Sequence, residues 1–177
     1  MITPKNIIDT LKDDYSCTLK EEKLLEMINS LELKLALEIL KIKEVLSVTL
    51  KKGESEIILP FPERCVERVF LENTQIEPLS DYVIKNNKLI FDEFSSERKI
   101  KIEYIKIPEA FTMQNFGQRP LVLGEENREI YIFHLLSREA LICEDMDRLN
   151  NYSRLYAESL KNLLSKKTPT SKFKNIW

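Results

Sequence analysis

The feature that most constrains the fold is a change in hydrophobic period along the chain. Between residues 24 and 46, apolar residues recur every three or four positions, which is the period of a helix that buries one face. Between residues 98 and 107 they alternate with charged residues, which is the period of a half-buried strand. The helical period returns after residue 125. We therefore expect an α+β fold, with a small antiparallel sheet or sandwich flanked by N-terminal and C-terminal helices.

The N-terminal segment, residues 1–46, predicts two helices. Thr3 and Pro4 are typical of an N-cap followed by the first helical residue, and a short helix should reach about Asp14. Thr18 and Glu21 match a capping box, which predicts a second helix over residues 18–46. The apolar face of this helix is wide, so it should pack on more than one neighbour. Core packing explains most of that surface, and contact with another subunit is the alternative.

The β block is expected over residues 47–107, with about five or six strands. The segments with strand character are residues 48–50, 56–59, 66–71, 82–84, 88–91 and 98–107. Gly53 predicts a turn, and Pro60 should end the strand before it because proline donates no hydrogen bond to a ladder. Asn86 and Asn87 predict a two-residue hairpin turn, since asparagine tolerates positive φ better than most residues.

Residues 108–124 are expected to form a loop that carries Phe111, Met113 and Phe116. These side chains either contact a partner or tuck beneath the loop, and the sequence favours neither reading. Two helices should follow over residues 125–164, with a break near residues 144–147. The domain prediction is one domain over residues 1–164 and a basic arm over residues 165–177.

No catalytic, metal or cofactor site is expected. The chain has only 3 glycines, and they do not fit either of the common phosphate-binding loops. Its 3 cysteines are widely spaced, and His134 is the only histidine and falls on an apolar helical stripe. Adjacent carboxylates point in different directions on a helix, so a solvated face explains them. We predict a protein that is not an enzyme and that has no membrane partner, because no apolar run is long enough to span a bilayer.

The C-terminal segment is the most distinctive candidate for binding. Residues 165–177 hold four lysines and no acidic residue, whereas residues 1–164 contain all 29 acidic residues. Three interpretations stay open: an arm that docks on an acidic protein, stacking on single-stranded nucleic acid, or a solvated tail. The residues expected to bind a partner are Lys166, Lys167, Lys172, Phe173, Lys174, Ile176 and Trp177.

The order of segments resembles that of the head-to-tail adaptor, or connector, proteins in the neck of tailed bacteriophages and prophages. The segments that carry the resemblance are KLLEMINSLELKLALEIL, KKGESEIILPFPERCVERVFLENTQIEPL, DYVIKNNKLIFDE with RKIKIEYIKIP, and REIYIFHLLSREALICEDMDRLNNYSRLYAESLKNLL. They cover most of residues 18–164. The low glycine count in the sheet loops departs from the family pattern. None of these segments contains a catalytic motif, so no catalytic residues are carried over.

The resemblance implies a homo-oligomeric ring of about twelve copies below the portal, with double-stranded DNA passing through the lumen without sequence-specific contact. Its partners would be the portal protein and a tail-side neck or tail-terminator protein. It would sit in the virion neck after assembly in the bacterial cytoplasm, and the basic arm would hold the portal. The alternatives are a stopper or tail-completion protein and, in another class, a DNA-binding accessory factor.

Overall fold

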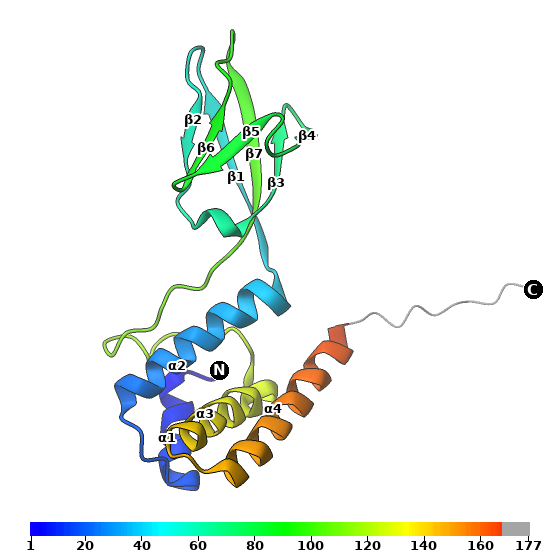
Figure 1. The fold of residues 1–177 in the computed structure, drawn as a ribbon. Coiled ribbons are helices and arrows are strands. Elements are labelled where there is room, and N and C mark those ends of the chain that lie inside the picture. Colours follow the sequence, from blue (N-terminus) through cyan, green and yellow to red (C-terminus); the bar gives the residue numbers. More distant parts are fainter. Residues whose placement is uncertain (168–177) are drawn as a thin grey trace, which may run out of the picture. The chain divides into compact units, whose positions relative to one another are not determined.

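The computed structural model describes residues 1–167, and their contacts divide into two compact units (Figure 1). The helical unit joins residues 1–32 to the chain from Glu109 onward. The sandwich unit is the continuous segment Leu33–Pro108. The predicted α+β class, with helices on both sides of a β block, is confirmed. The sequence predicted one domain over residues 1–164, whereas the contacts form two units.

The helical unit begins with α1 (Pro4–Tyr15), whose predicted start is confirmed. The Thr3 hydroxyl accepts a hydrogen bond from Asn6 N–H, and the Asn6 side chain accepts one from Thr3 N–H. This reciprocal pair satisfies backbone groups that have no partner within the helix. Helix α2 (Glu21–Lys34) follows, and its last two residues, Leu33 and Lys34, are counted with the sandwich unit.

The C-terminal half of the helical unit is a helical hairpin. The 3-10 turn η3 (Glu125–Asn127) leads into α3 (Arg128–Ile142), and α4 (Met146–Lys167) returns beside it (Figure 1). Two aromatic pairs join the helices: Phe133 stacks on Tyr152, and the His134 ring lies 5.1 Å from the Tyr156 ring. The predicted break near residues 144–147 is confirmed, although it is shorter than expected.

The predicted helix over residues 18–46 is wrong at both ends. Helix α2 begins at Glu21, because the N–H and hydroxyl of Thr18 bind Glu139 instead of capping the helix. After α2 the chain forms a π-helical stretch, η1 (Leu35–Leu40), and Lys41 ends it with a φ of 45°. Strand β1 (Lys43–Leu50) then pairs with β7 along its whole length. This distant pairing prevails over the apolar helical stripe that ran through Leu46.

The sandwich unit consists of two antiparallel sheets. The four-stranded sheet has the order β1-β7-β3-β4, and the three-stranded sheet has the order β2-β6-β5. A 3-10 turn, η2 (Glu63–Cys65), precedes β3. The remaining strands are β2 (Glu56–Ile58), β3 (Val66–Leu71), β4 (Thr74–Ile76), β5 (Tyr82–Lys85), β6 (Lys88–Phe91) and β7 (Arg98–Ile105).

The core of the sandwich is apolar, because one side chain in two along each strand points inward. The buried set comes from both sheets and comprises Leu50, Ile57, Leu59, Val69, Tyr82, Leu89, Phe91, Ile100 and Ile102. The Asn86-Asn87 turn is confirmed, with φ of 52° and 61°. Strand β4 was not predicted, because the turn before it uses Glu72, a residue that rarely adopts positive φ.

Helix α4 continues through Lys167, so the predicted start of an extended arm at residue 165 is wrong. The Ser165 hydroxyl donates to the carbonyl of Asn162, one turn earlier in the same helix. Lysine and serine are compatible with helix, so the helical backbone hydrogen bonds can continue to Lys167. Residues 168–177 lie outside the described part of the chain.

Candidate interaction surfaces

A buried carboxylate, Glu32 on α2, fastens the long loop to the helical unit. Glu32 is 3% exposed and accepts hydrogen bonds from Val122 N–H at 3.1 Å and from the Tyr131 hydroxyl. Tyr131 on α3 in turn accepts one from Leu123 N–H at 3.2 Å. Burial raises the pKa of Glu32, and the hydrogen bonds from Tyr131 and Val122 only partly offset it. Burial, and then the charge of Glu32, raise the pKa of Tyr131.

A second buried carboxylate, Glu139 on α3, fastens the connection between α1 and α2. It accepts hydrogen bonds from Thr18 N–H at 2.7 Å and from the Thr18 hydroxyl at 3.1 Å. Arg148 lies 3.1 Å from its other oxygen. Burial alone would raise the pKa of Glu139, but the hydrogen bonds from Thr18 and Cys17 and the charge of Arg148 together lower it. Both carboxylates therefore act as structural anchors for irregular backbone.

The three apolar side chains of the loop over residues 109–124 differ in how far they are buried. Phe111 is buried, and the Asn29 side chain binds both its N–H and its carbonyl, at 2.7 and 2.9 Å. The Arg119 guanidinium lies over the Phe111 ring. Phe116 is half-buried, and Met113 is exposed. Of the three candidates for a loop contact, Met113 is thus the most exposed, at 41%.

The described residues contain no group of side chains arranged to hold a metal ion. Over residues 1–167, no three or more His, Cys, Asp or Glu side chains are grouped to hold a metal ion. His134 is half-buried against the Tyr156 ring, consistent with its predicted place on an apolar stripe. The three cysteines, all within the described part, are free thiols, and Cys143 alone is exposed.

The turn between α3 and α4 carries apolar side chains on the surface. Leu141, Ile142 and Met146 are 48%, 52% and 59% exposed, and Cys143 lies among them. Glu144, Asp145 and Asp147 complete residues 141–147, which contain no basic residue. We call these seven residues the turn patch. It combines exposed apolar surface with three negative charges.

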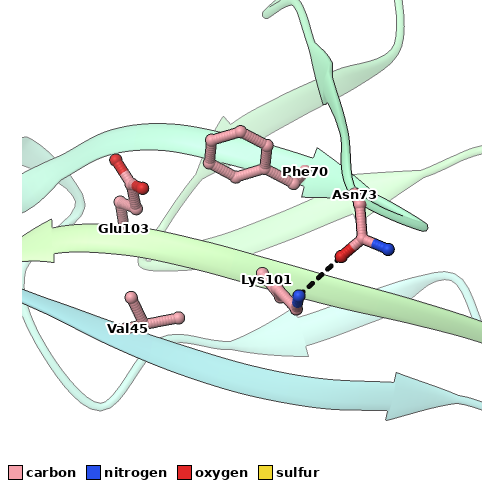
Figure 2. A pocket seen from close by; sticks show the side chains of 5 residues that line it. All are labelled: Val45, Phe70, Asn73, Lys101 and Glu103. Atoms are coloured by element: carbon pink, nitrogen blue, oxygen red, sulfur yellow. Dashed lines mark hydrogen bonds between the residues drawn. The ribbon is translucent and has the colours of Figure 1, made fainter.

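The outer face of the four-stranded sheet carries a second apolar site, shown in Figure 2. A shallow pocket of about 230 Å³ is lined by Val45, Phe70, Asn73, Lys101 and Glu103. Val45 is 58% exposed, and Phe70 is half-buried. Lys101 donates to the Asn73 side chain across the pocket rim (Figure 2). We call this site the sheet pocket.

The predicted tail residues fall on both sides of the described boundary. Lys166 is exposed in the last turn of α4, and Lys167 is the last residue of that helix. The other five, Lys172, Phe173, Lys174, Ile176 and Trp177, lie outside the described residues. Their proposed role in binding a partner stays a prediction.

Sequence reasoning missed both the turn patch and the sheet pocket. Leu141 falls in the helices predicted over residues 125–164, and its side chain is about half exposed. A signal was present, because Leu141, Ile142 and Cys143 are consecutive and three consecutive helical residues cannot all face one core. For the sheet pocket, Val45 was placed in a helix and gave no such signal.

No helix among the described residues is long and apolar enough to cross a membrane. Comparison of the chain with models of known protein families and with curated proteins found no match.

Proposed function

We propose that this chain is a structural neck protein of a tailed bacteriophage or prophage. It is a head-to-tail adaptor whose copies form a ring of about twelve below the portal. The order of its segments supports this role, since a β block lies between helical segments as the resemblance implies. The ring links the capsid portal to a tail-side neck or tail-terminator protein.

The observation that carries the proposal is apolar surface that neither unit buries. In the sandwich unit, Val45 is 58% exposed and lines the sheet pocket together with Phe70. Leu141 and Met146 are about half exposed or more in the helical unit. Clustered apolar side chains at a surface mark sites of protein contact. A chain with such sites on both units suits a protein that functions inside an assembly.

The net negative charge of residues 1–164 favours a channel through which DNA passes without being bound. Residues 1–164 hold 29 acidic and 23 basic residues, so the body repels a phosphate backbone overall. DNA binding by charge neutralisation would require clustered lysine and arginine. We therefore place double-stranded DNA in the lumen of the ring, without sequence-specific contact.

Antibody-gold labelling of intact particles from the source, viewed by negative-stain electron microscopy, tests the proposal. Label confined to the head–tail junction is the expected result. Free protein in the lysate with no label on any particle, despite an exposed epitope, would favour the DNA-binding accessory factor instead. Co-purification with the portal in the absence of tails would separate the adaptor from a stopper or tail-completion protein.

The basic tail supplies the portal contact in this proposal. Because α4 is helical through Lys167, a truncation after that residue removes the tail and keeps all of α4 as described. Loss of residues 168–177 should abolish portal binding and leave the unfolding of the chain unchanged. Trp177→Ala should reduce binding more than Lys172→Glu if an aromatic anchor dominates the contact. Normal portal binding by the truncated chain would remove this role.

A further inference from the structure

We propose that the turn patch of one copy binds the sheet pocket of a second copy, so that copies associate head to tail. The closure of the assembly into a ring rests on the proposed function. The inference adds which two surfaces of the chain meet, and it names a second copy of the chain as the occupant of both sites.

The turn patch is a preorganised projection. Glu144 has a φ of 56°, which turns the chain sharply at the end of α3. Its N–H donates to the carbonyl of Leu141 at 3.3 Å, and Asp145 N–H donates to that of Ala140 at 2.9 Å. Asp145 also accepts from Arg148 N–H at the start of α4. Both helix ends are thus capped within the turn, so the backbone that carries the exposed side chains loses little further freedom on binding.

The sheet pocket offers matching chemistry on the outer face of the four-stranded sheet. The strand register sets Val45 beside Glu103, and Phe70 beside Lys101. A cavity of about 150 Å³ accommodates a benzene ring, so a pocket of about 230 Å³ has room for an aliphatic side chain. Leu141, Ile142 and Met146 of the turn patch are side chains of that kind.

The charges of the two surfaces are opposite. The turn patch has three acidic residues and no basic one. The register and the hydrogen bonds between Glu72 and Lys99 bring four basic and three acidic residues to the outer sheet around the pocket, a small positive excess, namely Lys43, Arg68, Lys99, Lys101, Glu67, Glu72 and Glu103. Opposite charges around apolar contacts fix orientation and raise the rate of association.

The two surfaces lie on different units of the same chain and are not alike. A contact between unlike patches of identical copies is heterologous, so each copy still has one free patch of each kind after the first contact. Such contacts propagate and close into a ring when the rotation between copies allows it. A contact between two like patches would stop at a dimer.

A disulfide trap tests the contact in the full chain. Cys143 lies in the turn patch and is the exposed cysteine, whereas Cys17 and Cys65 are buried. Ser47 is exposed on β1 and lies directly across from Lys101 of the pocket. Mild oxidation of the Ser47→Cys protein should therefore give a reducible ladder of dimers, trimers and larger species on a non-reducing gel, because a disulfide requires the two Cα atoms within about 7 Å.

Two controls make the trap specific. Ser96→Cys places a thiol at another exposed position, in the loop before β7 and not paired with a pocket residue, and should give no ladder. Adding Cys143→Ser to Ser47→Cys should remove the ladder. A ladder that survives, or a compact monomer with an internal disulfide, overturns the contact between copies.

Charge reversal provides a second measurement that does not depend on cysteine geometry. Lys101→Glu should weaken self-association at least about tenfold in sedimentation experiments, because it sets like charges against each other. Asp147→Lys in the same chain should restore it. Lys88→Glu on the other sheet, where Lys88 pairs with Glu56, is the matched control and should change little.

The outcomes separate this contact from the proposed function. Absence of both the ladder and the charge rescue overturns the contact, while gold label at the neck would still support the adaptor role. A ladder with charge rescue establishes the contact even if no particle carries the label, and the neck role then fails alone.

Discussion

The helical unit and the sandwich unit differ in what holds them together. In the sandwich unit, over residues 33–108, every buried residue is apolar. In the helical unit, Glu32 and Glu139 are almost completely buried, and each binds a backbone N–H of an irregular segment. The first unit depends on the area of contact between two sheets, and the second depends in addition on two specific carboxylates.

The difference follows from how each unit is built. The sandwich is one continuous segment, and its strands satisfy one another's backbone groups. The helical unit is built from two separate stretches of chain, residues 1–32 and the chain from Glu109 onward. Each stretch contains irregular backbone, namely the connection between α1 and α2 and the loop over residues 109–124. The N–H groups of these segments do not pair with a neighbouring strand. A buried N–H without a partner is costly, so side chains from helices supply the acceptors.

The largest expected effect is in the sandwich core. Ile102 on β7 is fully buried, and Ile102→Ala should lower the free energy of unfolding by about 2–5 kcal/mol, since it removes apolar contacts and leaves a cavity. Chemical denaturation followed by circular dichroism would measure the loss. Val45→Ala, at an exposed site, is the control and should change stability by less than about 0.5 kcal/mol. Similar losses for the two variants would contradict the assigned core.

The next largest effect is expected at an anchor of the helical unit. Glu139→Ala leaves Thr18 N–H without its acceptor and should cost about 1–3 kcal/mol in unfolding free energy. Glu158→Ala breaks an exposed pair with Arg154 on α4 and should cost about 0.5 kcal/mol or less. If the two variants are equally stable, Glu139 is not an anchor. The helical unit would then not depend on this buried carboxylate.

The two anchors should also give opposite dependence on pH. The raised pKa of Glu32 means that the folded chain holds this proton more tightly than the unfolded chain. Its contribution to stability is complete below the ordinary glutamate pKa and is lost as the pH rises through the raised value. The lowered pKa of Glu139 has the reverse effect, with its contribution complete above the ordinary pKa and lost as the pH falls through the lowered value.

Substitution by glutamine separates these two contributions. The natural chain should lose stability as the pH rises above the ordinary glutamate pKa, and Glu32→Gln should abolish that decrease. The natural chain should also lose stability as the pH falls below the ordinary glutamate pKa, and Glu139→Gln should abolish that second decrease. Unfolding by denaturant at a series of pH values, for each variant against the natural chain, measures both. Changes on the same side for both variants would refute the assigned directions.

The smallest expected effect is a gain of stability in the sandwich unit. Leu79 is 87% exposed and has a φ of 69°, a conformation that leucine adopts at a cost. Leu79→Asn should raise the free energy of unfolding by about 0.5–1 kcal/mol, because asparagine tolerates this region better. Leu79→Ala removes the side chain but keeps the strain, so it should change little. Equal stability of the two variants would show that the strain is negligible.

Residues whose partners lie close in sequence could be predicted. The Thr3 cap and the Asn86-Asn87 turn depend on neighbours a few positions away, and both are confirmed. The alternation in residues 98–107 likewise predicted β7, which ends two residues earlier than expected.

The candidate surfaces could not be predicted in the same way. Val45 lies on an apolar stripe that suits a helix, and only its pairing across from Glu103 makes it part of a sheet pocket. For Leu141, Ile142 and Cys143, three consecutive helical residues cannot all face one core, but this pattern does not say which of them are exposed or by how much. The exposed area depends on what packs nearby, which a local pattern does not contain.

By itself, the sequence determined the α+β class, the order of helical and strand segments, and the turns that local conformational preference dictates. Only the tertiary structure decided that helix gives way to β1 after Leu40, and that Glu32 and Glu139 are buried anchors. The physical reason is the range of the interactions. Helix caps and turns are settled within a few residues, whereas β1 pairs with a strand far along the chain, and Glu32 binds Tyr131 from 99 residues away.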